Sequence, residues 1–373
     1  MKRPESMQRR SRQLGVSLIE LLVAALLGLI VVAGLIQVLL ANRRAYQVQQ
    51  GSNYLQQNLR FANDTVSWSV RMAGFWGGVL PNEIQGLTDG TGASSCNDAW
   101  LLAAQNATGS GSVYGVDGGA KFPVTGCVND ANYVPGSDVL VVRYADADPC
   151  AVDTGATALD TSTCLPASTY YLAANVGQTG QIFKASASVP TLPGSTHRYV
   201  YPYRVDMYYL QPCSDTSGGN CSATSDGGTP QPTLMRMSIS GGKFQAFPIV
   251  SGIEQLQFEY GVYIPSGQQS EVPAVNQYKS AAKMTDQDWT NVLSVRVSMV
   301  ARGRERDLSI PQTGTFALTG TCSYEVDAGG KFTLTSTGAD CDGFSMAGLN
   351  RPDQFVRTLM QQTVQLRNRS RGG

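Results

Sequence analysis

An almost unbroken apolar run lies close to the N-terminus, from Leu18 to Ala41, interrupted by Glu20, Gln37 and two glycines. It is long enough to span a bilayer, and no small-residue cleavage site of a secretory signal follows it. Residues 1–15 carry five basic side chains against one glutamate, which predicts that this end stays in the cytoplasm. The run therefore predicts a membrane-spanning helix, and a plain membrane anchor is the simplest alternative.

Glu20 does not fit a plain anchor. A charge inside a membrane helix costs roughly 2.5–3.5 kcal/mol and marks a functional residue by default. If the chain were cut between Gly15 and Val16, the new α-amino group would lie close to Glu20 along the chain. That amine could pair with the Glu20 carboxylate of the same chain or of a packed neighbour.

The six residues Gly15-Val16-Ser17-Leu18-Ile19-Glu20 resemble the prepilin motif of type IV pilins and type II secretion pseudopilins, whose pattern is Gly-Phe-Thr-Leu-Ile-Glu. The resemblance implies that a membrane aspartyl prepilin peptidase cuts after Gly15 and N-methylates Val16. It also implies that Glu20 pairs with a neighbouring subunit's N-terminus during assembly.

Beyond the apolar run, helical periodicity continues on one face only. Apolar residues recur every three, four or seven positions, and the glycines at 74, 77 and 78 provide a stop; these apolar residues are Val48, Leu55, Leu59, Ala62, Val66, Val70 and Ala73. One helix of over fifty residues is expected. The predicted organisation is a leader at 1–15, a membrane and assembly half-helix at 16–41, an amphipathic half-helix at 42–75 and an extracytoplasmic β-rich head at 76–373.

The sequence of the head predicts antiparallel β-structure. Together with the long N-terminal helix, this predicts an α+β, pilin-like fold. Val292–Arg302 alternates apolar and polar residues, which predicts a half-buried strand. Long loops are expected at 86–136 and 145–198, and residues 213–230 form the clearest low-complexity loop. The other expected strands are 138–144, 198–210, 234–240, 244–250, 253–262, 331–336 and 355–366.

Several short segments of the helix and head resemble landmarks of the PilW family of minor pilins, which is similar to the J-type minor pseudopilins of type II secretion. The resemblance spans both ends of the chain but not the region between about 80 and 230. The segments are residues 59–62, 71–75, 250–254, 258–262, 295–297 and 364–368, together with Trp289.

Eight cysteines favour disulfides, because an even number in an exported chain is typical of bridges; buried free thiols are the alternative. The expected pairs are Cys213–Cys221 and Cys322–Cys341, each flanking one Gly-rich turn. With no CxxC and a single histidine, His197, no metal cluster is expected.

Signals for enzyme chemistry are weak, so no catalytic residue, no cofactor and no enzyme activity are expected. A hydrolytic triad would need His197, but the sequence contains no Gly-x-Ser-x-Gly motif to supply a nucleophilic serine. The aspartate pairs at 286 and 288 and at 146 and 148 are better explained by turns than by Ca²⁺. Five tyrosines between 199 and 209 fit a strand better than a nucleic-acid stacking surface, and the net charge is zero. The arginines at 302, 304 and 306 indicate either a solvated edge or a contact with an acidic partner subunit.

These patterns predict a minor pilin that primes assembly of a type IV pilus at or near its tip and supports twitching motility. The alternatives are a J-type minor pseudopilin or a membrane-tethered exported adhesin. Expected partners are other minor pilins and the major pilin through the N-terminal helix, the prepilin peptidase, the inner-membrane assembly platform and a tip adhesin, with no nucleic acid. The expected location is the inner membrane, with the head in the periplasm, and then the cell-surface pilus.

Overall fold

The computed structural model describes residues 15, 17–85, 111–153, 164, 170–184, 189–193, 198–216, 219–240, 243–265, 274–308, 311–337, 340–346 and 349–368. The chain divides into two units, Met1–Gln50 and Gly51–Gly373. The helix α1 runs from Leu18 to Met72 and contributes to both units. Its 55 residues confirm the predicted long helix.

The second half of α1 packs into the head through the predicted apolar face. Ala62, Val66 and Val70 are fully buried in the main hydrophobic core, as are Leu55, Leu59 and Ala73. The side chain of Val48 lies outside the described residues. The helix ends before Gly74, whose φ of +72° favours glycine and whose amide donates to the Arg143 carbonyl at 3.1 Å.

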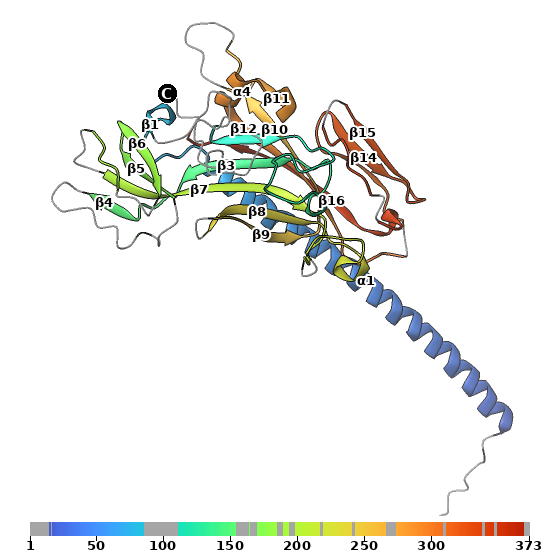
Figure 1. Ribbon diagram of the computed structural model, residues 1–373. Coiled ribbons are helices and arrows are strands. Elements are labelled where there is room, and N and C mark those ends of the chain that lie inside the picture. Colours follow the sequence, from blue (N-terminus) through green and yellow to red (C-terminus); the bar gives the residue numbers. More distant parts are fainter. Residues whose placement is uncertain are drawn as a thin grey trace, which may run out of the picture. The chain divides into compact units, whose positions relative to one another are not determined.

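Among the described residues, nine strands form one sheet around the long central strand β7, Arg198–Gln211 (Figure 1). The first half of β7 pairs with β4 and β5, and its second half pairs with β3 and β8. All pairs are antiparallel except β1 with β6. The other strands are β1 Ile84–Gln85, β2 Val113–Val116, β3 Val139–Ala145, β4 Ala151–Asp153, β5 Tyr170–Asn175, β6 Thr179–Lys184, β8 Thr233–Ser240 and β9 Lys243–Ser251.

Two smaller antiparallel sheets complete the head. One has the order β11-β10-β12-β16 and the other the order β13-β14-β15. Their bounds are β10 Ile253–Val262, β11 Gln277–Lys279, β12 Val292–Arg302, β13 Gly314–Ala317, β14 Cys322–Val326, β15 Phe332–Ser336 and β16 Arg357–Gln365. Short helical turns connect these elements: η1 Pro81–Glu83, η2 Asp130–Asn132, α3 Ser225–Gly228, η3 Ala281–Lys283, α4 Asp286–Thr290 and η4 Pro352–Gln354.

The structure corrects two expectations about the head. The regions 86–136 and 145–198 are not only loops, because they contain β2, β4, β5 and β6. The strand β12 is buried on both faces: Ser294 and Ser298 are each only 1 % exposed. The reason is a second covering layer, since Gln361 donates to Ser298 Oγ and also to the carbonyls of Ala317 and Leu318 at the end of β13.

The tyrosines of β7 belong to two cores. Tyr208 lies in the core that contains α1, whereas Tyr203 and Tyr209 lie in a second core with Trp76. Tyr203 stacks on Trp76 with the ring centroids 6.1 Å apart. Burial of these rings accounts for the aromatic run and leaves them unavailable for stacking on nucleic-acid bases.

A buried ionic cluster joins β10, β12, β14 and β16, and it corrects the expectation for Arg302. The Glu254 carboxylate accepts two hydrogen bonds from Arg357, at 2.6 and 3.1 Å, and one from the Tyr324 hydroxyl at 3.1 Å. The Nε atom of Arg302 lies 3.4 Å from the same carboxylate. Because the Arg302 side chain is only 3 % exposed, it forms neither a solvated edge nor a contact for a partner subunit.

Candidate assembly site on the N-terminal helix

The start of α1 is fixed by a hydrogen-bonded cap at Ser17. The Ser17 hydroxyl accepts the Glu20 amide at 3.2 Å, and the Ser17 carbonyl accepts the amides of Glu20 and Leu21, each at 3.1 Å. Ser17 and Glu20 have the Ser-x-x-Glu spacing of a capping box, a signal that the sequence analysis overlooked. Gly15 is exposed and precedes the helix, while Val16 lies outside the described residues.

Glu20 stands in the first turn of α1. The free amides of a helix start amount to about half a positive charge, which stabilises a carboxylate there. Half a charge does not balance a full carboxylate inside a bilayer, so a second positive group is needed for full compensation. An α-amino group on Val16 would be a full charge one residue before the cap.

The segment of α1 after Glu20 presents apolar side chains on every side. The span Leu18–Arg43 has a mean hydropathy of 2.8, and none of its most apolar window is buried. Leu18 is 79 % exposed and Leu29 is 71 % exposed. Each such side chain is worth about 1.5–3 kcal/mol when removed from water, so this surface requires lipid or other apolar helices.

The described cysteines lie in the head, and all of them are disulfide-bonded. Cys213 is bonded to Cys221 and Cys322 to Cys341, which are the two expected pairs. A further bridge, Cys150–Cys164, was not expected. Cys127 is also disulfide-bonded, and Cys96 lies outside the described residues. Closing such short loops stabilises a fold by about 2–4 kcal/mol per bridge.

In each aspartate pair considered for Ca²⁺, one carboxylate forms an ion pair within the head. Asp288 forms a capping box with Thr285 at the start of α4 and an ion pair with Lys279 at 2.8 Å. Asp146 pairs with Arg204 at 2.9 Å. His197 lies outside the described residues. Within the described part of the chain, no three His, Cys, Asp or Glu residues are grouped so as to hold a metal ion.

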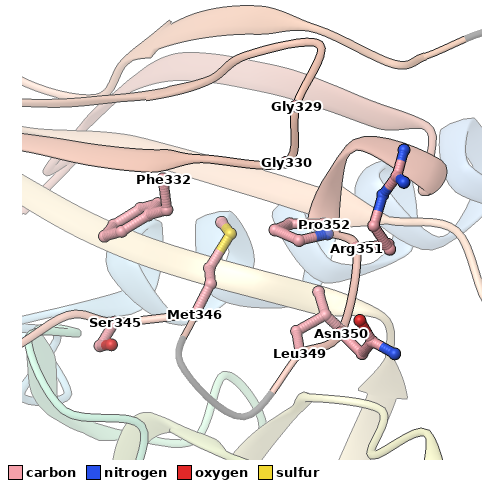
Figure 2. A pocket seen from close by; sticks show the side chains of 9 residues that line it. All are labelled: Gly329, Gly330, Phe332, Ser345, Met346, Leu349, Asn350, Arg351 and Pro352. Atoms are coloured by element: carbon pink, nitrogen blue, oxygen red, sulfur yellow. The ribbon is translucent and has the colours of Figure 1, made fainter.

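A pocket of about 650 Å³ lies beside β15 and η4. Figure 2 shows Met346 between Phe332 and Pro352, with Leu349 close by. Its one charged lining residue is Arg351, which is ion-paired with Asp353 at 2.7 Å.

A long apolar N-terminal helix followed by a mostly antiparallel, disulfide-bridged β-head defines a type IV pilin-like protein. Residues 10–36 match the prokaryotic N-terminal methylation motif, and residues 208–368 match the Type IV Pilus-assembly protein W family. By these two matches the chain is similar to type IV minor pilins of the PilW family. No curated protein and no solved structure matches it.

The two matches coincide with distinct parts of the molecule. The methylation motif covers the Ser17 cap, Glu20 and most of the apolar segment. The PilW match begins inside β7 and runs through β8 to β16, including the buried ionic cluster. The methylation motif and the apolar helix indicate a membrane-anchored pilin, and the PilW match indicates interaction with other components of the pilus.

The mature chain should begin at Val16, with a methylated α-amino group. Gly15 is exposed and precedes the Ser17 cap, so cleavage after Gly15 would leave the described start of α1 intact. Intact-mass analysis of the membrane-extracted protein measures this directly. A chain that begins at Met1, or after Ala41, would contradict the prepilin interpretation.

Proposed function

We propose that this protein primes assembly of a type IV pilus, that it occupies a position at or near the filament tip, and that it acts structurally, not as an enzyme. The observation that carries the proposal is Glu20, placed in the capped first turn of an exposed apolar helix. A tether gains nothing from a carboxylate at that depth, whereas a subunit that docks against another subunit's N-terminal amine does.

The free-energy cost of extracting the apolar helix from the membrane favours a subunit dedicated to initiating pilus assembly. Moving Leu18–Arg43 from lipid into water exposes many large side chains, at a cost of tens of kcal/mol in total. The helix must therefore pass directly into a bundle of similar helices. Minor pilins gathered in the inner membrane on the assembly platform, with their heads in the periplasm, would supply that bundle before major pilin is added.

The size of the head supports a position used once per filament. Its described residues alone form three sheets with sixteen strands, and β1, β4, β5 and β6 widen the largest sheet beyond β7. A shaft repeats its subunits at a close axial rise, which favours compact heads. Retention of Glu20 further favours a place below another minor pilin, with an adhesin as a candidate partner at the tip.

Proteomics of purified surface pili, combined with deletion of the gene, tests the proposal. The protein should be present far below one copy per major subunit. The deletion should nearly abolish surface pili and twitching while major pilin stays abundant in the membrane. Near-equal stoichiometry, or normal piliation in the deletion strain, would overturn the tip-priming role. Normal pili with a loss of protein secretion would indicate a pseudopilin instead.

A further inference from the structure

The strand β16 forms one edge of the four-stranded sheet. It is last in the order β11-β10-β12-β16, and its nine residues keep an unbroken register with β12. At its start the amide of Gly303 donates to the Val356 carbonyl at 2.8 Å, and at its end the amide of Leu366 donates to the Leu293 carbonyl at 2.9 Å. Opposite residues of antiparallel strands alternate between pairs that exchange main-chain hydrogen bonds and pairs that do not. The even-numbered residues of β16 therefore bond to β12, and the odd-numbered residues direct their amides and carbonyls away from it.

Four residues of β16 thus present both main-chain groups along the outer edge of the sheet. They are Leu359, Gln361, Thr363 and Gln365, and the last three are exposed. In the described part of the chain, no other residue bonds to their amides or carbonyls. A row of unpaired main-chain groups of this kind is a template for a further strand.

The other edge strands that the structure describes are short or carry features that oppose pairing. The strands β1, β2, β4, β11, β13 and β15 have five residues or fewer. The strand β9 also has nine residues, but it begins with Lys243 and contains Pro248, beside an irregularity in its register with β8. Residues 358–365 of β16 have no charge, no proline and no bulge. Because long edges are usually protected by such features, the bare edge of β16 indicates a place for another strand.

The charges at the two ends of β16 disfavour a second copy of this chain as the partner. Residues 367–373, which follow the strand, contain three arginines and no acidic residue. At the other end Arg304 and Arg306 are exposed with one carboxylate, Glu305, between them. The Arg306 guanidinium lies 5.5 Å from the Phe355 ring, close to the start of β16. Two copies paired through β16 in either direction would place positive charge against positive charge, whereas an acidic residue in the partner would balance it.

We propose that the outer edge of β16 binds an extended strand of a different protein, in which an uncharged run as long as β16 ends in an acidic residue beside residues 367–373. Main-chain hydrogen bonds to the four outward-facing residues supply the affinity, and the charge at the end of the strand sets the direction of pairing. The inference goes beyond the proposed function, because it requires no place at the pilus tip. All of the residues involved lie in the second unit, Gly51–Gly373, and none belongs to α1.

Photocross-linking of the full-length protein in the cells that produce it tests this contact. We would place p-benzoylphenylalanine at Gln365 and, as the matched control, at Gln245, an exposed glutamine on the proline-containing edge strand β9. Position 365 should give at least about fivefold more adduct than position 245. Mass spectrometry should map the adduct to a different protein, in an uncharged segment that ends in an acidic residue.

Two further changes, each made in the protein with the cross-linker at 365, separate main-chain pairing from charge. Thr363→Pro removes one outward amide and keeps the bonds to β12, so the adduct should fall about tenfold while thermal unfolding stays nearly unchanged. Thr363→Val keeps the amide and should change the adduct by less than about twofold. Arg369→Glu with Arg371→Glu reverses the charge outside the strand and should lower the adduct at least about fivefold. This charge reversal provides a test even if Thr363→Pro does not accumulate.

Several outcomes would overturn the inference. They are equal adducts at 365 and 245, an adduct only with a second copy or with another part of the same chain, and no adduct although the protein is present at its normal level. An adduct that survives both Thr363→Pro and the charge reversal would also overturn it. Absence of the protein from surface pili, together with the expected adduct, would overturn the proposed function alone.

Discussion

Replacing Glu20 with alanine should reduce surface piliation at least about tenfold while the amount of this protein in the membrane stays equal or rises. The substitution removes a charge whose insertion costs roughly 2.5–3.5 kcal/mol, so membrane insertion does not suffer. Assembly suffers instead, because the partner amine loses its counter-ion, and each 1.4 kcal/mol of lost pairing is a factor of ten. Quantitative immunoblots of sheared pili and of membranes measure both amounts in one strain.

Two control variants separate charge from helix capping. Glu20→Gln keeps the side chain's size but removes the charge, so it should behave like Glu20→Ala. Ser17→Ala removes the hydroxyl that accepts the Glu20 amide, which costs about 0.5–2 kcal/mol of local helix stability and leaves the carboxylate in place. Ser17→Ala should therefore keep most of the piliation. Normal piliation with Glu20→Ala at normal protein levels would show that the pairing role is wrong.

The helix and the central strands were predictable because their signals are local. The spacing of Leu55, Leu59 and Val66 is enough to define a buried helical face, and the structure buries all three. The alternating residues of Val292–Arg302 predict β12 with its observed ends. In each case the pattern that specifies the element lies within one continuous stretch of sequence.

The strands β5 and β6 were not predicted, because their own residues give only a weak strand signal and pairing with other strands stabilises them. Residues 170–175 and 179–184 are short and contain alanine, asparagine, glycine and threonine, which weaken a strand signal. Their pairing with each other and with β7 supplies what their composition lacks. The same reason explains the error over β12, since its second covering layer comes from Gln361 and the β13 end, far along the chain.

The same difference between local and distant signals applies to the functional residues and to the buried ionic cluster. Gly15, Val16 and Glu20 are neighbours in sequence, so a motif is enough to select them. The buried ionic cluster could not be predicted from the sequence. Glu254 and Arg357 are separated by 103 positions, and only the pairing of β10, β12 and β16 brings them together.

That cluster leads to the largest expected effect on stability. Glu254→Gln should lower the free energy of unfolding by about 3–5 kcal/mol, because it leaves the buried guanidinium groups of Arg302 and Arg357 without a counter-charge. Urea denaturation of the oxidised full-length protein in detergent measures the loss. Glu259→Gln is the matched control on the same strand: its partner Arg296 is 36 % exposed, so the loss should stay below about 1 kcal/mol.

The pH dependence of stability should follow the same carboxylate. Burial alone would raise the pKa of Glu254, but the charge and hydrogen bonds of Arg357 outweigh burial and hold the pKa below its usual value. A carboxylate with a lowered pKa in the folded state contributes stability above its unfolded pKa, near 4.3, and loses it as the pH falls through the folded value. Acidification from pH 6 to below about pH 4 should therefore destabilise the native protein more than the Glu254→Gln variant, in which this titration is absent. Parallel acid-unfolding curves, or equal losses for Glu254→Gln and Glu259→Gln, would show that the buried cluster does not hold the C-terminal sheet together.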